Sequence, residues 1–123
     1  MTYRECLPNG CPPDEAEEII ADIVVFRLVR TNSPTNNDFR SQRSEKPDNP
    51  FSVPECQARG LSVFSELEDA KKKTRLKNLK GTLACRVTLT KGAGYIQQTG
   101  RRNHYTWWPL ADFDILAHCK VMK

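Results

Sequence analysis

The spacing of hydrophobic positions predicts a series of short strands along this chain. Ile23–Arg30 is rich in β-branched and aromatic residues, which are typical of strands. Gly60–Phe64 predicts a second strand, and Thr82–Thr90 predicts a third because its apolar and polar residues alternate. The turn Lys91–Gly94 follows at once, so we expect Tyr95–Thr99 to form a hairpin with the third strand.

Helix signals lie between these strands. Pro12–Ala21 opens with prolines and has carboxylates in its first turn, where a preset φ and the helix dipole favour a helix start. Ser65 with Glu68 forms a capping-box pattern before a lysine-rich helix, and Thr35 is expected to cap a short helix of its own. With a last strand over Ile115–Met122, the pattern predicts an α+β fold. We expect a mixed or antiparallel sheet of about five short strands with two or three helices.

Charge is distributed unevenly along the chain. Residues 1–22 contain six acidic groups and one basic group, whereas the whole chain of 123 residues has a net charge of +4. We therefore divide the chain into an acidic N-terminal arm with a short helix (1–22) and a single compact α+β domain (23–123). The arm is a candidate docking segment for a protein partner.

The first residues and the cysteines bear on the compartment. The acidic N-terminus lacks the layout of a signal peptide, so we expect a cytoplasmic protein. Five cysteines are an odd number, which in that compartment predicts free thiols and folding without a disulfide. A zinc site of Cys6, Cys11, Cys56 and His118 would lack the second pair that structural zinc sites normally show, so no metal is expected. No apolar run approaches the ~20 residues that span a bilayer, which argues against a membrane partner.

The segment 99–109 holds the densest mixture of chemically useful side chains. It contains two arginines, a histidine, a tyrosine and two tryptophans: Arg101, Arg102, His104, Tyr105, Trp107 and Trp108. Guanidinium forks match phosphate oxygens, aromatic rings stack on bases, and a histidine exchanges protons near neutral pH. The alternative is that one tryptophan anchors the core while the arginines are solvated, and the pattern leaves both interpretations open.

Two polar residues stand inside apolar strands. Arg27 lies among valine, phenylalanine and leucine, where burying its charge is costly unless it meets an anion. That anion is either a ligand phosphate or a carboxylate of the protein. Ser62 is flanked by apolar residues, where a hydroxyl either satisfies the backbone or faces a site.

A basic run extends over residues 71–80. Such a run is often a solvated helix face, but it also attracts phosphates. An alternative function is therefore a nucleic-acid-binding module, in which Tyr105 and Trp107 stack on bases. Its phosphate track would consist of Lys71, Lys72, Lys73, Arg75, Arg101 and Arg102. Because no base-reading motif is present, we expect this binding to be weak, non-specific and salt-sensitive.

Four short motifs carry a resemblance to a group of small uncharacterised bacterial proteins, over residues 24–119. They are FRLVRTN (26–32), Pro34-Thr35 with Asp38-Phe39, GLSVF (60–64), and Thr99-Gly100 with His104-Tyr105-Thr106 and Trp108. The order of an arginine on an early strand, then a serine-bearing strand followed by a helix, is similar to the ADP-ribosyltransferase superfamily. The resemblance implies a domain that binds NAD or another nucleotide.

The same resemblance assigns roles to particular residues. It implies that Arg27 steadies NAD and that Ser62 shapes the nicotinamide pocket. Those enzymes usually carry a glutamate on a late strand, and this chain has none after Glu68. Some members use arginine and histidine instead, so His104 is the candidate catalytic residue. In the resulting hypothesis of a nucleotide cleft, Tyr105 or Trp107 stacks on a ring of the ligand. Whether the chain is an enzyme, a nucleic-acid-binding module or a partner-binding protein without catalysis stays open at this point.

Overall fold

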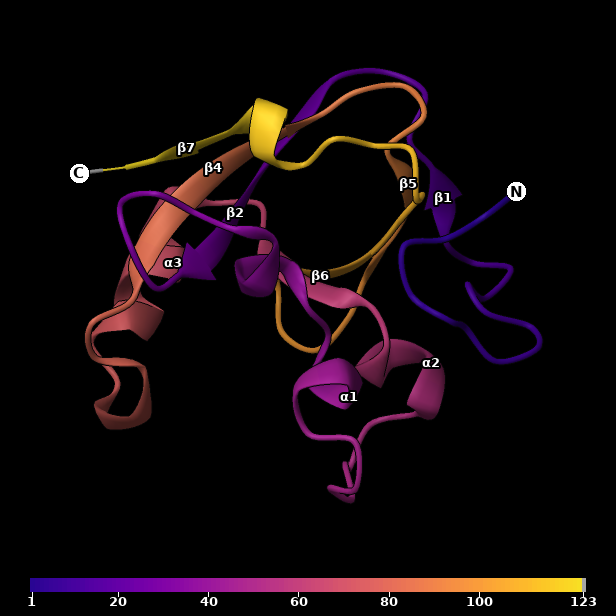
Figure 1. The fold of residues 1–123 in the computed structure, drawn as a ribbon, viewed down its shortest axis with the longest axis horizontal. Helices are drawn as coiled ribbons and strands as arrows, with labels where there is room; N and C mark the ends of the chain where they lie inside the picture. Colours follow the sequence, from indigo (N-terminus) through magenta and orange to yellow (C-terminus); the bar gives the residue numbers. More distant parts are fainter. Residues whose placement is uncertain (123) are drawn as a thin grey trace.

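Seven strands form one antiparallel sheet in the spatial order β1-β5-β6-β3-β2-β4-β7 (Figure 1). The computed structural model describes residues 1–122. The strands are β1 (Glu17–Glu18), β2 (Ile23–Val29), β3 (Leu61–Phe64), β4 (Leu83–Leu89), β5 (Gly94–Gln98), β6 (His104–Pro109) and β7 (Cys119–Val121). The helices are α1 (Gln42–Glu45), α2 (Glu55–Ala58) and α3 (Leu67–Thr74), with 3-10 turns η1 (Asn36–Phe39), η2 (Lys77–Leu79) and η3 (Leu116–His118). The predicted compact α+β domain is confirmed, with more strands than the sequence suggests.

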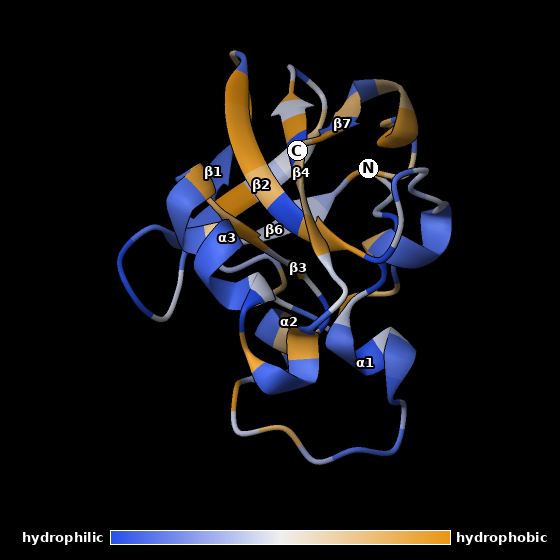
Figure 2. Ribbon diagram, turned by 90° about the vertical axis from the view of Figure 1, so that its left-hand side faces the viewer, coloured by the Kyte–Doolittle hydropathy of each residue, from blue (hydrophilic) through white to orange (hydrophobic). Residues whose placement is uncertain are grey.

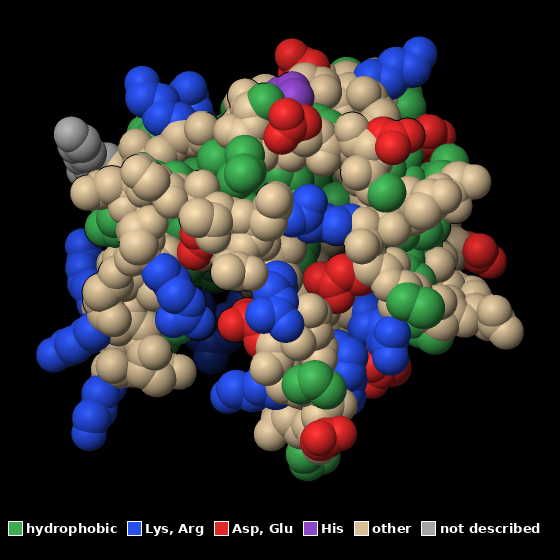
Figure 3. All heavy atoms as spheres, viewed as in Figure 1, with side chains coloured by type: hydrophobic (Ala, Val, Ile, Leu, Met, Phe, Trp, Pro, Cys, Tyr) green, Lys and Arg blue, Asp and Glu red, His purple; other side chains and the backbone are tan. Residues whose placement is uncertain are grey.

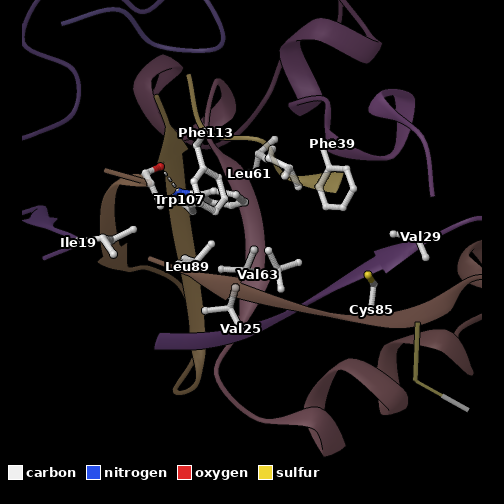
Figure 4. Close-up of a cluster of buried hydrophobic side chains, with 13 residues drawn as sticks. Ile19, Val25, Val29, Phe39, Leu61, Val63, Cys85, Leu89, Trp107 and Phe113 are labelled. Carbon is white, nitrogen blue, oxygen red and sulfur yellow. Dashed lines mark hydrogen bonds between the residues drawn. The ribbon is translucent and has the colours of Figure 1, made fainter. Parts of the chain in front are cut away.

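One face of the sheet carries the main hydrophobic core. Alternate residues of the strands point to this face, including Val25 of β2, Val63 of β3 and Trp107 of β6 (Figure 4). Trp107 is fully buried, its ring meets the Phe113 ring edge-on, and its Nε1 donates to the carbonyl oxygen of Ala93 at 3.0 Å. Because its one polar atom is satisfied, Trp107 is an anchor of the core.

Helix α3 covers part of the opposite face. Ala70 of this helix is buried with Phe64 and Ala84, and Phe26 and Leu28 of β2 pack beside them. Figure 2 shows that the helices are mainly hydrophilic, whereas apolar residues concentrate in β2 and β4. The helices therefore bury only narrow faces against the sheet.

Strand β2 is paired very unequally with its two neighbours. It pairs with β4 along its whole length, from Ile23 to Val29. It pairs with β3 at one position only, Phe26 opposite Phe64. Past this position the two strands are no longer in register, so main-chain groups of β3 that face β2 need other partners. The cleft described below opens at this point.

The predicted helix over Pro12–Ala21 is wrong. This segment contains strand β1, in which Glu17 pairs with Ile96 and Glu18 pairs with Tyr95 of β5. Ile19 follows and is buried in the main core, and its N–H donates to the carbonyl of Gly94. Covering the free edge of β5 and burying Ile19 outweigh the local helix signals, because propensity is a weak prior against tertiary packing.

The predicted hairpin between Thr82–Thr90 and Tyr95–Thr99 is also wrong. Strand β4 pairs with β2 and β7, whereas β5 pairs with β6 and β1. Gly92 in the turn and Gly94 at the start of β5 both have positive φ. A Cβ on Gly94 would clash with the main-chain oxygen of Trp108, so this glycine lets β5 pass close against β6. The chain thereby leaves the edge of β4 and starts a new pair.

The two predicted caps differ in outcome. Thr35 caps η1 in a capping box with Asp38, as predicted. The predicted box at Ser65 is wrong, because Glu66 is the N-cap of α3 and makes no side-chain capping bond. The Ser65 hydroxyl instead lies 3.4 Å from the side-chain oxygen of Asn103 in the loop before β6, and its N–H donates to the Asn103 carbonyl. A tertiary partner has replaced the local one.

The free-thiol prediction is wrong for two cysteines. Cys11 and Cys56 form a disulfide with a Cα–Cα distance of 5.5 Å, and it ties the N-terminal segment to α2. The bond spans 45 residues, so no local pattern indicates it. It also uses two ligands of the zinc alternative, and residues 1–122 contain no cluster of side chains that could hold a metal ion.

The acidic segment 1–22 packs onto the rest of the domain. Besides strand β1, Arg4 donates its N–H to the carbonyl of Pro109, and Glu5 accepts hydrogen bonds from the main chain and hydroxyl of Ser41. In the described part of the chain, no helix is long and apolar enough to cross a membrane.

Candidate functional site

A hollow of about 400 Å³ lies where β2 parts from β3. Its walls come from β2, β3, β6, the segment around η1 and α1, and the end of α3 with η2. Residues that line it include Arg27, Glu45, Ser62, Phe64, Lys73 and His104. Three residues that the sequence singled out, far apart in the chain, are thus brought together in one cleft.

Ser62 and His104 form a hydrogen-bonded pair inside this cleft. In the register of β3 and β6, Ser62 lies opposite Thr106 and Phe64 lies opposite His104. Ser62 and His104 are therefore diagonal neighbours on one face of the sheet, where side chains are within reach of each other. Their Oγ and Nε2 atoms are 2.5 Å apart.

The other ring nitrogen of His104 decides the direction of that bond. Nδ1 lies 2.8 Å from the main-chain oxygen of Thr99, and a carbonyl oxygen can only accept. In the neutral ring Nδ1 therefore carries the hydrogen, and Nε2 accepts the proton of the Ser62 hydroxyl. The Phe64 ring meets the imidazole edge-on with centroids 5.4 Å apart, which holds the ring in place.

Arg27 bridges three segments through main-chain carbonyls. Its guanidinium donates to Asp38 at 2.9 Å and to Arg40 at 3.0 Å. A third bond reaches the carbonyl of Ser62 at 2.9 Å and replaces the strand pairing that β2 and β3 lose after Phe26. These bonds use three of the five N–H groups of the side chain.

The charge of Arg27 has no direct counterpart. Along residues 1–122, none of the ion pairs involves Arg27. Burial lowers the pKa of the Arg27 guanidinium to about 10, while the carboxylates of Glu45 and Asp38 act in the opposite direction. The group stays charged at neutral pH, and its hydrogen bonds go to carbonyl oxygens alone. An anion entering the cleft would meet this charge, because Arg27 lines the hollow.

Glu45 is a cleft residue that the sequence analysis missed. It ends helix α1 and lines the hollow together with Arg27, Ser62 and His104. Its carboxylate lies 3.6 Å from the guanidinium of Arg30, and both side chains are exposed. The only signal was its place in a loop longer than most connections, a class that often covers a site.

A second hollow of about 530 Å³ adjoins the first and shares Phe64, Lys73 and His104 with it. It is lined by four cationic side chains: Lys72, Lys73, Arg101 and Arg102. In the described chain none of these four forms an ion pair. Figure 3 shows Lys and Arg side chains bordering a hollow between the side that carries α3 and the side that carries α1.

The structure does not bring together every predicted cation. Lys71 and Arg75 lie on another face of α3, beside a hollow lined by Thr82 and Met122. The six-residue phosphate track is therefore divided. Only its members Lys72, Lys73, Arg101 and Arg102 border the cleft.

Tyr105 and Trp107 lie on the other side of β6 from His104. Adjacent residues of a strand point to opposite faces, so Tyr105 packs against the main core and Trp107 is buried within it. Neither ring is placed to stack on a ligand beside His104. The apolar surface of the cleft comes from Leu28, Phe64 and Leu79 instead.

Comparisons with known proteins assign nothing further to this chain. No protein-family model matches it, and no curated protein or solved structure matches it either.

Proposed function

We propose that this cleft binds NAD or a related nucleotide and that the protein is an ADP-ribosyltransferase-like domain. The observation that carries the proposal is the meeting of Arg27, Ser62 and His104 in one hollow. These are the three positions to which the sequence resemblance assigns a role. They lie 35 and 42 residues apart along the chain, so nothing local requires them to meet.

The donor set suits a ligand with two or more phosphates. The unpaired charge of Arg27 lies in the first hollow, and the cations Lys72, Lys73, Arg101 and Arg102 border the second. Lys73 and His104 belong to both, so an extended anionic ligand can contact both hollows at once. Phe64 offers an aromatic edge where the two hollows meet.

Glu45 supplies the carboxylate that the late strands lack. NAD would supply a ribose whose bond to nicotinamide is broken with development of positive charge on the sugar. A carboxylate beside the ring stabilises such a charge, as in glycosidases. On this proposal Glu45 faces the developing charge, Arg27 holds phosphate, and His104 holds or accepts a proton through Nε2.

Calorimetric titration of NAD, ADP-ribose and AMP into the protein tests the proposal. Lys73→Ala should weaken the binding of each ligand that the wild type binds, because Lys73 lines both hollows. Lys71→Ala is the matched control: it removes the same charge from the same helix, on a face away from the cleft. If the wild type binds none of the three at millimolar concentration, or if both variants weaken binding equally, the proposal is wrong.

A nucleic-acid-binding module is the second candidate function. It is favoured by the four unpaired cations around the second hollow. Its affinity should be weak and should fall steeply with salt, since charge is the main source of attraction. Fluorescence anisotropy with a labelled single-stranded oligonucleotide at two salt concentrations measures this binding and its salt dependence. Displacement of the oligonucleotide by AMP would mean that both ligands bind in the same cleft.

A further inference from the structure

The pair of Ser62 and His104 has the parts of an activated nucleophile. The hydroxyl donates to Nε2 at 2.5 Å, and the imidazole is oriented from its far side by the carbonyl of Thr99 at 2.8 Å. A nucleophile, a base within hydrogen-bond reach and a third group that orients the base are the general signature of covalent catalysis by serine. Here a main-chain carbonyl takes the place of the usual carboxylate.

Burial does not explain this pair. Ser62 is exposed to the cleft, so water could satisfy its hydroxyl at no cost. Neither Ser62 nor His104 belongs to the two hydrophobic clusters. The hydroxyl therefore faces incoming molecules while its proton is already directed at a base.

Arg27 completes the arrangement as an anion stabiliser. Its bond to the carbonyl of Ser62 fixes the main chain that carries the nucleophile. Arg27 lines the same hollow as Ser62, and its three hydrogen bonds leave two of its five N–H groups available. A cation preorganised beside a nucleophile stabilises the negative oxygen that forms when a carbonyl is attacked.

We propose that Ser62 is a nucleophile for carboxylic esters, with His104 as its general base and Arg27 as the stabiliser of the oxyanion. Ser62 Oγ bonds to the ester carbonyl carbon as its proton moves to His104 Nε2, and the carbonyl oxygen becomes negative. The bond to the alcohol oxygen then breaks, and the alcohol leaves with the proton from Nε2. Water, deprotonated by the same nitrogen, releases the acid and regenerates Ser62. This acyl transfer goes beyond nucleotide binding.

The test is reaction of the full chain with 4-nitrophenyl acetate and with a fluorophosphonate probe, followed by mass spectrometry. We expect a burst of nitrophenolate, one acetyl group per chain and a phosphonyl group on the same peptide, both mapped to Ser62. Ser62→Ala should lose both adducts. His104→Ala should slow acylation about 10²–10⁴-fold, the usual contribution of a general base.

A control variant separates chemistry from structure. Ser65→Ala removes a nearby serine that bonds to Asn103 rather than to histidine, and it should react like the wild type. Adducts on other residues in the wild type, or acylation of folded His104→Ala at the wild-type rate, would overturn the proposal. The nucleotide titrations are unaffected by either outcome, so the two proposals fail separately.

Discussion

Two arginines organise the loops of this protein, and they do so in opposite ways. Arg43 is paired with the carboxylate of Glu55 through two bonds of 2.8 and 2.9 Å, and it also donates to the carbonyls of Pro47 and Asn49. Arg27 makes its three bonds to carbonyls alone. The first arginine is paired with a carboxylate, whereas the second forms no ion pair within residues 1–122.

The surroundings of the two arginines follow the same division. Glu55 also accepts from Arg59 at 2.8 Å, and the next residue, Cys56, is held by the disulfide to Cys11. Around Arg27 the strands β2 and β3 share one residue pair, and a hollow opens. Charge pairs and a covalent bond therefore tie the region around α2 together, while a hollow opens beside Arg27. We use the arginine without a carboxylate as the guide to the proposed binding site.

The largest expected effect is loss of the disulfide, which tests how far the α2 region depends on it. Reduction, or the double change Cys11→Ser with Cys56→Ser, should lower the free energy of unfolding by about 4 kcal/mol, because a 45-residue loop is released in the unfolded chain. Urea denaturation with and without a reductant measures the difference. Equal midpoints would mean that the disulfide contributes nothing to the stability of the protein.

Removing the Arg27 fork should have the next largest effect. Arg27→Met keeps most of the volume but leaves three carbonyls without a donor, and we expect a loss of ~3 kcal/mol in the free energy of unfolding. Arg43→Met should cost less, because its ion pair is at the surface and water replaces it. Parallel urea titrations decide the order, and a larger loss in Arg43→Met would reverse the comparison.

Anion binding should distinguish the two arginines more sharply than stability does. Pyrophosphate at ten times its dissociation constant should stabilise the wild type by about 1.4 kcal/mol, since it binds the folded state alone. Arg43→Met should show the same stabilisation, and Arg27→Met a clearly smaller one, each measured against its own ligand-free melting curve. Equal stabilisation in both variants would place the anion away from Arg27.

The smallest expected effect is a dependence of the free energy of unfolding on pH, through Glu55 of α2. Hydrogen bonds from Arg43 and Arg59 lower the pKa of the Glu55 carboxyl to about 2. A depressed carboxyl pKa stabilises the folded state above the unfolded value of about 4.3, and this stabilisation is lost as the pH falls toward 2. The wild type should therefore be more stable than Glu55→Gln near neutral pH, and most of this difference should be lost at about pH 2. Urea midpoints of both proteins at the two pH values check this. A gap that persists in acid would point to packing rather than charge.

Local signals in the sequence were sufficient for part of this fold. The β-branched run of β2, the alternation of β4 and the cap at Thr35 all act between neighbours, and each prediction holds. The helix expected over Pro12–Ala21 and the hairpin after β4 fail, because the edge of β5 and its approach to β6 decide them. Those contacts lie far away in the sequence.

The candidate site divides in the same manner. Arg27, Ser62 and His104 were singled out, and the fold brings them to one cleft. Tyr105 was predicted to lie with them. It follows His104 in the same strand and must therefore face the opposite side of the sheet, so alternation alone could have excluded it from the site. The place of Glu45 in the cleft could not be predicted, because the segment around α1 has no periodic pattern that shows which of its side chains line the hollow.

The hydrogen bonding of the sheet is interrupted between β2 and β3, which share a single residue pair, Phe26 with Phe64. Strands β1, β5, β6 and β3 carry Ser62 and His104, and strands β2, β4 and β7 carry Arg27. The bond from the Arg27 guanidinium to the carbonyl of Ser62 therefore joins the two parts of the sheet where the strand ladder does not. The main core and helix α3 also span both parts. A substitution of Arg27 thus acts on the continuity of the sheet as well as on the cleft.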